Sequence, residues 1–274
     1  MAEESTDSQS PILHLSLHEL IVSESLDNLQ EDVSHDYYVS ADWSDEFYLL
    51  QALRGFIAVG YTTPKGHDFL LPQLQFSYCL LDFDRMHLSN KLKRSINEFA
   101  DWRLRVNHDI SAVIRGISEY HPKSWLNASY VSLIRRLHEQ GPLLLRDPID
   151  NTQVLFHLCS IELYDIQNRL VAGELGYVIG RTYTSLTGYC ERLKNFSIGK
   201  LQILALAKVL EVSGFAFMNL GQPPVDNLMN YKAEIGGFVF SRAEFLNRWK
   251  PACRETPRRI TDFIHFDSRL ADIF

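Results

Sequence analysis

Hydrophobic positions along the chain alternate between strand-like and helix-like spacing. Positions 70–83 alternate between apolar and polar residues, which predicts half-buried strands, and 56–61 has the pattern of a shorter strand. Two longer apolar runs, 154–164 and 170–180, are typical of buried strands. Because only five residues separate these runs, we expect a hairpin, and residues 181–190 continue as a further strand.

Three amphipathic stretches are typical of helices. Each begins after a side chain that accepts a hydrogen bond from a free backbone N–H group, and two of them stop at a glycine. The expected helices are 46–54 between Asp42 or Ser44 and Gly55, 110–120 after Asp109, and a third between Asn127 and Gly141.

A longer helix over 198–212 is apolar almost all round, so we expect it to be buried against a sheet. A strand at 214–220 follows it. Ser241 and Glu244 have the spacing of a capping box, which predicts a last core helix that ends near Trp249. This order of strands and helices places the chain in the α/β (α+β) class.

Charge divides the chain unevenly. Residues 1–50 hold 12 acidic and no basic side chains, whereas the remaining 224 residues hold 27 basic and 22 acidic ones. An acidic leader on a mildly basic body is compatible with a polyanion partner, and equally with a solvated tail. We expect a largely mobile leader at 1–35, where the spacing over 13–26 allows a short docked helix, and a polar tail at 251–274.

Composition excludes several classes of protein. Apolar residues make up 46% and charged residues 22% of the chain, which is ordinary for a globular protein. The chain contains no run of about 18 apolar residues, so we expect no membrane span. The N-terminus lacks the pattern of a secretory signal. The cysteines are scattered, so we expect buried free thiols and no metal site, in a cytoplasmic protein. They are Cys79, Cys159, Cys190 and Cys253.

Six segments share an order and a spacing with one known family. They are RGF at 54–56, MHLSNKLKR at 86–94, SWLNASYVSLIRRLHEQG at 124–141, CSIELY at 159–164, LVAGELGYVIG at 170–180 and AEIGGFVFSRAEFL at 233–246. Each motif alone is weak, but their collinear series over roughly 40–250 resembles the leucyl/phenylalanyl-tRNA–protein transferase family.

The resemblance implies a fold and a reaction. The fold would be a small N-terminal α/β domain at 36–88 and an acetyltransferase-like (GNAT) domain at 89–250. The reaction would move a leucine- or phenylalanine-like amino acid from aminoacyl-tRNA to the N-terminal amine of an acceptor protein, as a degradation tag. It implies no cofactor and no membrane partner, and we expect a monomer.

The resemblance also implies catalytic positions. The family carries an Asp-x-Gln motif at the end of the strand that follows the buried helix. Here Asn219 stands at the aspartate position, and Gln222 matches the glutamine if one residue is inserted. A Gly-Glu-Ser segment of the preceding strand corresponds to Ser185, Leu186 and Thr187, so leucine replaces the acid. An asparagine amide does not take up a proton near neutral pH.

Substrate binding is implied for Ser185, Thr187 and several further positions. Trp125 would stack on the terminal adenosine of a tRNA, or instead fill a gap in the core. Gly236 and Gly237 would allow close backbone approach to a ligand, or form a tight turn. Basic side chains would contact tRNA phosphates, with a solvated surface role as the alternative. They are Lys91, Lys93, Arg94, Arg135 and Arg136.

Two other functions remain open. Leu186 and Asn219 are compatible with a catalytically silent relative that binds tRNA or protein N-termini. A coenzyme-A-dependent N-acetyltransferase would need a glycine-rich pyrophosphate loop before the buried helix, where the chain offers only Gly199. The transferase hypothesis requires one cleft that contains both Trp125 and Asn219.

Overall fold

The computed structural model describes residues 13–224 and 229–274. Its strands form a two-stranded and a nine-stranded sheet. They are β1 (Ile57–Thr62), β2 (Asp68–Gln73), β3 (Ser77–Leu81), β4 (Arg103–Val106), β5 (Leu143–Arg146), β6 (Gln153–Tyr164), β7 (Leu170–Ile179), β8 (Thr182–Cys190), β9 (Phe217–Asn219), β10 (Phe238–Ser241) and β11 (Asp267–Arg269).

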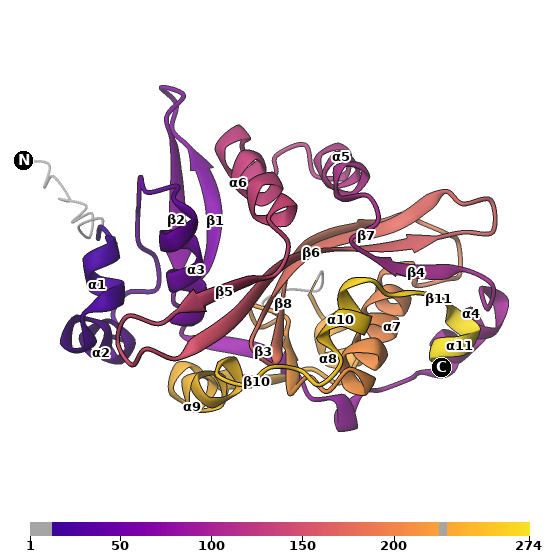
Figure 1. Cartoon of the computed structure of the whole chain (residues 1–274). Coiled ribbons are helices and arrows are strands. Elements are labelled where there is room, and N and C mark those ends of the chain that lie inside the picture. Colours follow the sequence, from indigo (N-terminus) through magenta and orange to yellow (C-terminus); the bar gives the residue numbers. More distant parts are fainter. Residues whose placement is uncertain (1–12, 225–228) are drawn as a thin grey trace, which may run out of the picture.

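The large sheet is mixed. Its strand order is β10-β3-β9-β8-β7-β6-β4-β11, with β5 also paired to β6 (Figure 1). All these neighbours run antiparallel except β8 and β9, which are parallel and are connected through a helix. The expected hairpin is β6–β7, and the mixed α/β class is confirmed.

Ten helices of four residues or more lie in the described part of the chain besides the long α7 (Ile198–Val212). They are α1 (Leu17–Ile21), α2 (Ser23–Glu31), α3 (Asp45–Leu53), α4 (Asn90–Glu98), α5 (Ile110–Tyr120), α6 (Ala128–Glu139), α8 (Tyr231–Glu234), α9 (Arg242–Cys253), α10 (Ile260–Ile264) and α11 (Leu270–Ile273).

Side-chain caps fix the start of the three predicted helices. The Ser44 hydroxyl accepts a hydrogen bond from Phe47 N at 3.2 Å, so Ser44 and not Asp42 caps α3. Asp109 caps α5 and Asn127 caps α6, each accepting a backbone N–H at 2.9 Å. All three predictions are therefore confirmed, because each depends on contacts within one turn of the chain.

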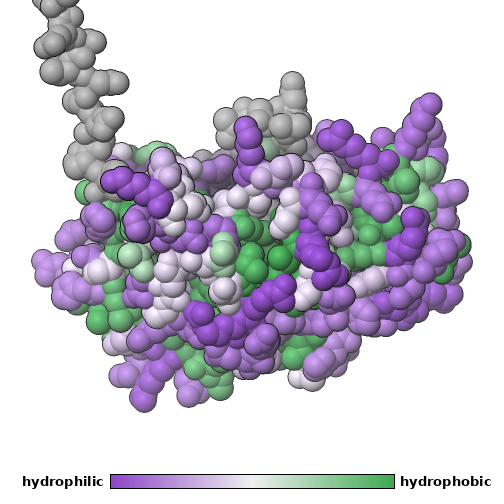
Figure 2. All heavy atoms as spheres, turned by 90° about the horizontal axis from the view of Figure 1, so that it is seen from above, coloured by the Kyte–Doolittle hydropathy of each residue, from purple (hydrophilic) through white to green (hydrophobic). Residues whose placement is uncertain are grey.

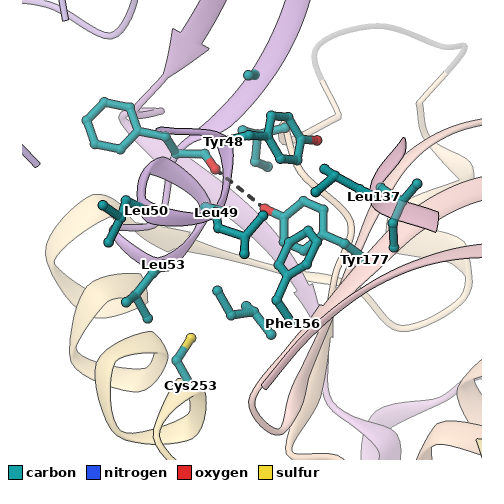
Figure 3. Packing of buried hydrophobic residues seen from close by; sticks show 14 of the residues in the cluster. Tyr48, Leu49, Leu50, Leu53, Leu137, Phe156, Tyr177 and Cys253 are labelled. Atoms are coloured by element: carbon teal, nitrogen blue, oxygen red, sulfur yellow. Dashed lines mark hydrogen bonds between the residues drawn. The ribbon is translucent and has the colours of Figure 1, made fainter. Parts of the chain in front are cut away.

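The two faces of the large sheet carry separate hydrophobic cores. Along β7, Leu175 and Tyr177 belong to the core that also contains side chains of α3, α5, α6 and α9. Ala172 and Val178 belong to the core formed with α7. Figure 3 shows part of the first core, where labelled residues from α3, α6, β6, β7 and α9 meet: Tyr48, Leu49, Leu50, Leu53, Leu137, Phe156, Tyr177 and Cys253.

Helix α7 covers the second face of the sheet (Figure 1). Its residues Leu201, Ala205 and Leu206 are fully buried against strands of the large sheet. The prediction of a buried helix is confirmed. Because α7 joins β8 to β9, it makes these two strands parallel neighbours, as a helical crossover does.

The predicted mobile leader is wrong for residues 13–35. Helices α1 and α2 pack on α3 and α9, and Leu20 and Leu26 are buried there. The short docked helix within this stretch is confirmed, whereas residues 1–12 lie outside the described residues. Long-range contacts decide this outcome: Arg54 Nε donates to Leu20 O at 2.9 Å.

The predicted C-terminal tail is also wrong. The last core helix continues past Trp249 to Cys253, where the final turn buries Ala252 and Cys253. Strand β11 then pairs with β4, and Phe263 and Leu270 are buried in the core around α7. The prediction failed because residues 251–274 are rich in polar side chains, and the few apolar side chains that they bury show no clear spacing in the sequence.

Strand β3 crosses the predicted division between the two domains. It comes from the stretch 36–88, yet it pairs with β9 and β10 in the large sheet. The hairpin β1–β2 forms the separate small sheet.

Candidate functional site

Strands β8 and β9 run parallel and then separate. They pair only where Thr182–Thr184 lie beside Phe217–Asn219. Beyond Thr184, β8 continues to Cys190 paired with β7, and its side chains change from buried to half-buried. Carboxyl ends of parallel strands are frequent binding positions in α/β folds. This divergence, from Ser185 of β8 to the turn after Asn219, is the candidate site.

A β-bulge shapes β8 at the start of the divergence. Ser185 lies opposite Gly176, whereas Thr187 lies opposite Leu175, so Leu186 is the extra residue. Ser185 therefore shares a face with Gly176 and the α7 side. The bulge brings both predicted substrate-binding residues to the candidate site, on opposite faces of the strand.

Asn219 ends β9 and is fully buried. Its Oδ1 accepts a hydrogen bond from Gly221 N at 2.9 Å, which stabilises a turn in which Gly221 has φ +72°. Its Nδ2 has no hydrogen-bond partner among the described residues. Gln222 follows this turn and donates from Nε2 to Gln73 Oε1 at 3.3 Å. The structure thus places the two predicted catalytic residues within one turn.

A buried lysine holds the same turn. Lys232 on α8 is 5% exposed, and its Nζ donates to Leu220 O and Gln222 O, each at 2.7 Å. Burial lowers the pKa of Lys232, while the nearby Cys79 and Glu174 raise it in part. Lys232 therefore restrains the backbone between Asn219 and Gln222. The sequence reasoning missed this residue.

Glu174 is a second charged residue that the sequence reasoning missed. It is 5% exposed, in the middle of β7, and Tyr183 Oη donates to its Oε1 at 2.9 Å. Burial raises the pKa of Glu174 to about 7, against the opposing effect of hydrogen bonds from Tyr183 and Ser185 and the charge of Lys232. The sequence contained one sign of this buried charge, because Glu174 is the only charged residue in the apolar run 170–180.

Gly236 and Gly237 form a tight turn between α8 and β10. Gly236 has φ +104°, and a Cβ there would overlap the carbonyl oxygen of Arg85. A Cβ on Gly237 would lie 2.7 Å from Lys232 O and 2.8 Å from Cys79 Sγ. Their small size is used for packing against the protein's own backbone, which corresponds to the turn alternative.

Trp125 lies in the connection between α5 and α6. Its ring packs edge-on against Tyr130 at a centroid distance of 4.7 Å, and it is half-buried at the border of the first core. Figure 2 shows the face of the molecule that carries α5, α6 and the β1–β2 hairpin, with apolar side chains gathered among polar ones.

Two cavities are described, and neither combines Trp125 with Asn219. The larger, of about 200 Å³, is lined by side chains of α4, α7, α8 and the segment before α4, and the smaller, of about 140 Å³, lies between α2, α9 and Arg54. The expectation of one cleft shared by Trp125 and Asn219 is not met by either cavity. The wide spacing of these residues in sequence gave no information on their distance in the fold.

The predicted tRNA-binding residues do not form one surface. Lys91, Lys93 and Arg94 are exposed on α4, which packs on α7. Arg135 and Arg136 lie on α6, on the opposite face of the sheet (Figure 1). Arg136 pairs with Asp45 at 2.7 Å, and Arg135 donates to Ser111 Oγ at 2.7 Å. The α6 arginines thus have structural partners.

In the described ranges 13–224 and 229–274, no helix is long and apolar enough to cross a membrane. The same residues contain no group of three or more His, Cys, Asp or Glu side chains that could hold a metal ion. All four cysteines are free thiols. Three of them are buried as predicted, and Cys190 is half-buried.

The fold and the polar ends of β8 and β9 define a mixed α/β protein with a candidate binding position at diverging parallel strands. The model of one family, the leucyl/phenylalanyl-tRNA protein transferases, matches residues 80–250. This match covers more than half of the chain and spans the whole candidate site. The chain belongs to the leucyl/phenylalanyl-tRNA protein transferase family.

Solved structures give weaker likenesses. The C-terminal domain (DUF2156) of a protein from Agrobacterium fabrum, assigned as a lysylphosphatidylglycerol synthetase, is 14% identical with a TM-score of 0.37, covering 70% of this chain and 56% of that one. L-PGS from Bacillus licheniformis is 12% identical with a TM-score of 0.32, covering 67% and 51%. The chain thus spans little more than half of each. A search among curated proteins found no match.

Proposed function

We propose that this protein transfers an amino acid from aminoacyl-tRNA to the N-terminal amine of a protein acceptor. The family match over 80–250 carries the proposal, and the polar groups at the divergence of β8 and β9 lie within it. An aminoacyl ester is already activated, so aminolysis needs chiefly a deprotonated and aligned amine. Positioning alone supplies up to about 7–11 kcal/mol of barrier reduction.

The finer fold assignment belongs to the same proposal. A GNAT-like domain at 89–250 would bind substrates between β8 and β9, where the parallel strands part after the α7 crossover. The small domain at 36–88 would contribute the β1–β2 hairpin beside Trp125, since Trp125 O lies close to Gly60. We place the activity in the cytoplasm, as a monomer that marks protein N-termini for degradation.

Individual residues receive roles in this proposal. Asn219 and the half-buried Gln222 would orient the incoming amine, with their amide oxygens accepting its N–H groups. Ser185 and Thr187 would border the substrate from β8, and Trp125 would stack on the terminal adenosine. The exposed Lys91, Lys93 and Arg94 of α4 would contact tRNA phosphates.

A transfer assay tests this function. The protein is incubated with radiolabelled leucyl- or phenylalanyl-tRNA and a peptide that begins with arginine. Label should appear in the peptide, and an N-acetylated copy of the same peptide should stay unlabelled because its amine is blocked. Absence of transfer with both donors and with the total aminoacyl-tRNA pool would remove the enzymatic proposal.

A second candidate is a catalytically silent relative that binds tRNA or protein N-termini. The complete burial of Asn219 and the presence of Leu186 at the family's acidic position favour it. It predicts salt-dependent tRNA binding without any extended peptide. Filter binding at two salt concentrations, run beside the transfer assay, separates the two functions.

A further inference from the structure

Glu174 lies on the α7 face of β7 beside two hydroxyl groups. By strand alternation it shares this face with Ala172 and Gly176. Gly176 leaves room for the phenol of Tyr183, since a Cβ there would overlap Tyr183 Oη. Tyr183 thereby reaches Glu174 Oε1 at 2.9 Å. Ser185 pairs with Gly176 and so lies on the same face, and its hydroxyl also lowers the pKa of the Glu174 carboxyl. Glycine and tyrosine together build a polar site inside an apolar strand.

Glu162, on the neighbouring strand β6, offers a direct comparison. It is also buried, and burial raises its pKa to about 7 against hydrogen bonds from Ser160, His108 and Asp109. However, its oxygens accept backbone N–H groups of His108 and Asp109 at 3.0 and 3.1 Å, at the start of α5. Glu162 also accepts a hydroxyl, from Ser160 at 2.6 Å, but its two backbone donors show that it stabilises a helix start. Glu174 accepts the Tyr183 phenol, and unlike Glu162 it shares a sheet face with Ser185 at the candidate site.

The charged and titratable groups that surround Glu174 come from several elements. Lys232 and Tyr231 approach from α8, Tyr183 from β8, and Cys79 of β3 adjoins Lys232. Helix α7, which packs on this face, has its charges in ion pairs: Lys200 with Glu234 and Lys208 with Glu211. Lys232 is thus the cation that faces Glu174, and it favours the ionised carboxylate.

Ser185 connects the buried carboxylate to the candidate site. It is the first residue of β8 beyond the pairing with β9, and it is half-buried where Thr184 is fully buried. Its side chain lies on the same face of the sheet as Glu174 and lowers the pKa of that carboxyl, and its strand borders the divergence. A hydroxyl in this position can pass a proton between a substrate and a carboxylate that the substrate does not touch.

On these observations we propose that Glu174 is the proton acceptor of the transfer reaction, acting through the Ser185 hydroxyl. The inference rests on the proposed function. The resemblance implies two family acids, at the positions of Asn219 on β9 and Leu186 on β8, and this chain has neither. In this chain the carboxylate would come from β7 instead, one strand away.

Every proton in the proposed transfer step has a donor and an acceptor. The acceptor enters as a free amine after its ammonium form has lost a proton to solvent. As the amine nitrogen bonds to the ester carbonyl carbon, its extra proton moves to Ser185 Oγ while the Ser185 proton moves to Glu174. When the bond from this carbon to the ribose oxygen breaks, Glu174 returns the proton through Ser185 to that oxygen. The products are the amide and the free ribose hydroxyl.

The test compares Glu174→Gln with Glu162→Gln in the transfer assay. Removing a proton acceptor should lower kcat by about 100- to 1,000-fold in Glu174→Gln. Wild-type kcat should rise with pH around 7, and this dependence should disappear in Glu174→Gln. Glu162→Gln should keep both the rate and the pH profile. Ser185→Ala should lose activity, and Ser185→Thr, which keeps a hydroxyl, should recover most of it.

The outcomes separate two failures. If wild-type protein transfers amino acids and Glu174→Gln retains its kcat and pH profile, the role of Glu174 is refuted while the function stands. Equal losses in Glu174→Gln and Glu162→Gln would indicate a structural effect and also refute it. If the wild-type protein transfers no amino acid, both the proposed function and the role of Glu174 are refuted.

Carbon-13 NMR of the glutamate carboxyls adds a measurement on the wild-type protein, so it does not depend on the folding of a variant. Titration of Glu174 far below pH 7 would contradict the proposal.

Discussion

The buried ion pair between Arg54 and Asp147 provides the most sharply defined stability prediction. Arg54 is 5% exposed and Asp147 is fully buried, and Nη1 and Nη2 of Arg54 each donate to the carboxylate at 2.7 Å. Arg54 Nε also donates to Leu20 O at 2.9 Å, which links the end of α3 to α1. The perturbation is Arg54→Met, which keeps the apolar stem and removes the charge.

The expected loss follows from the burial of the remaining partner. Removing one member of a buried pair costs about 3–5 kcal/mol, because the other charge is left uncompensated. Asp147 keeps Ile149 N as a donor at 2.9 Å and Arg254 Nη2 at 3.3 Å, which places the loss at the lower end. About 3 kcal/mol corresponds to a fall in Tm of about 5 °C for a chain of this size.

The pH dependence of this loss has a defined sign. Burial raises the pKa of Asp147, but hydrogen bonds from Arg54 and Ile149 and the charge of Arg54 lower it overall below 3.8. The pair therefore stabilises the fold above the unfolded-state pKa and loses this effect as the pH falls through the folded-state pKa. In Arg54→Met the lowering effect of Arg54 is lost and burial raises the pKa of Asp147, so the penalty should shrink as the pH falls through this raised pKa.

Urea unfolding of wild-type protein, Arg54→Met and the double variant Arg54→Met with Asp147→Leu measures these differences. The double variant should recover most of the lost stability because no buried charge remains. A loss below about 1 kcal/mol in Arg54→Met, or a double variant less stable than the single one, would refute the reasoning.

Two further predictions concern the turn at Gly236 and the basic helix α4. Gly236→Ala should cost at least about 2 kcal/mol more than Gly66→Ala, since both glycines have positive φ but only the Cβ at 236 would overlap backbone. Similar urea midpoints for the two variants would contradict this. Replacing Lys91, Lys93 and Arg94 by alanine should reduce the salt dependence of tRNA binding by two to three phosphate contacts, roughly 0.7–0.9 of slope each. An unchanged dependence of the tRNA binding constant on salt concentration would show that the tRNA does not bind at α4.

Local rules predicted the helices well. Ser44, Asp109 and Asn127 each cap a helix through contacts within three residues, so the sequence alone contained the necessary information. The hairpin β6–β7 was equally accessible, because its short connector leaves few alternative pairings. The same rules could not place β3 in the large sheet, since that depends on pairing with β9 and β10 far along the chain.

The candidate site was predictable only in part. The resemblance indicated Asn219, Gln222 and Ser185, and the structure gathers them at the divergence of β8 and β9. It gave no sign of Glu174 and Lys232, whose properties depend on burial and on partners from other elements. Charge state is a tertiary property, so a glutamate within an apolar strand cannot be assigned from its neighbours in sequence.

Mass spectrometry of an arginine-initiated peptide tests the central claim most directly. The peptide is incubated with the protein and the total pool of aminoacyl-tRNA, which leaves the choice of amino acid to the protein. The account predicts a mass increase of one aminoacyl residue at the N-terminus, and none in an N-acetylated copy. An unmodified peptide in the presence of every charged tRNA would contradict the account.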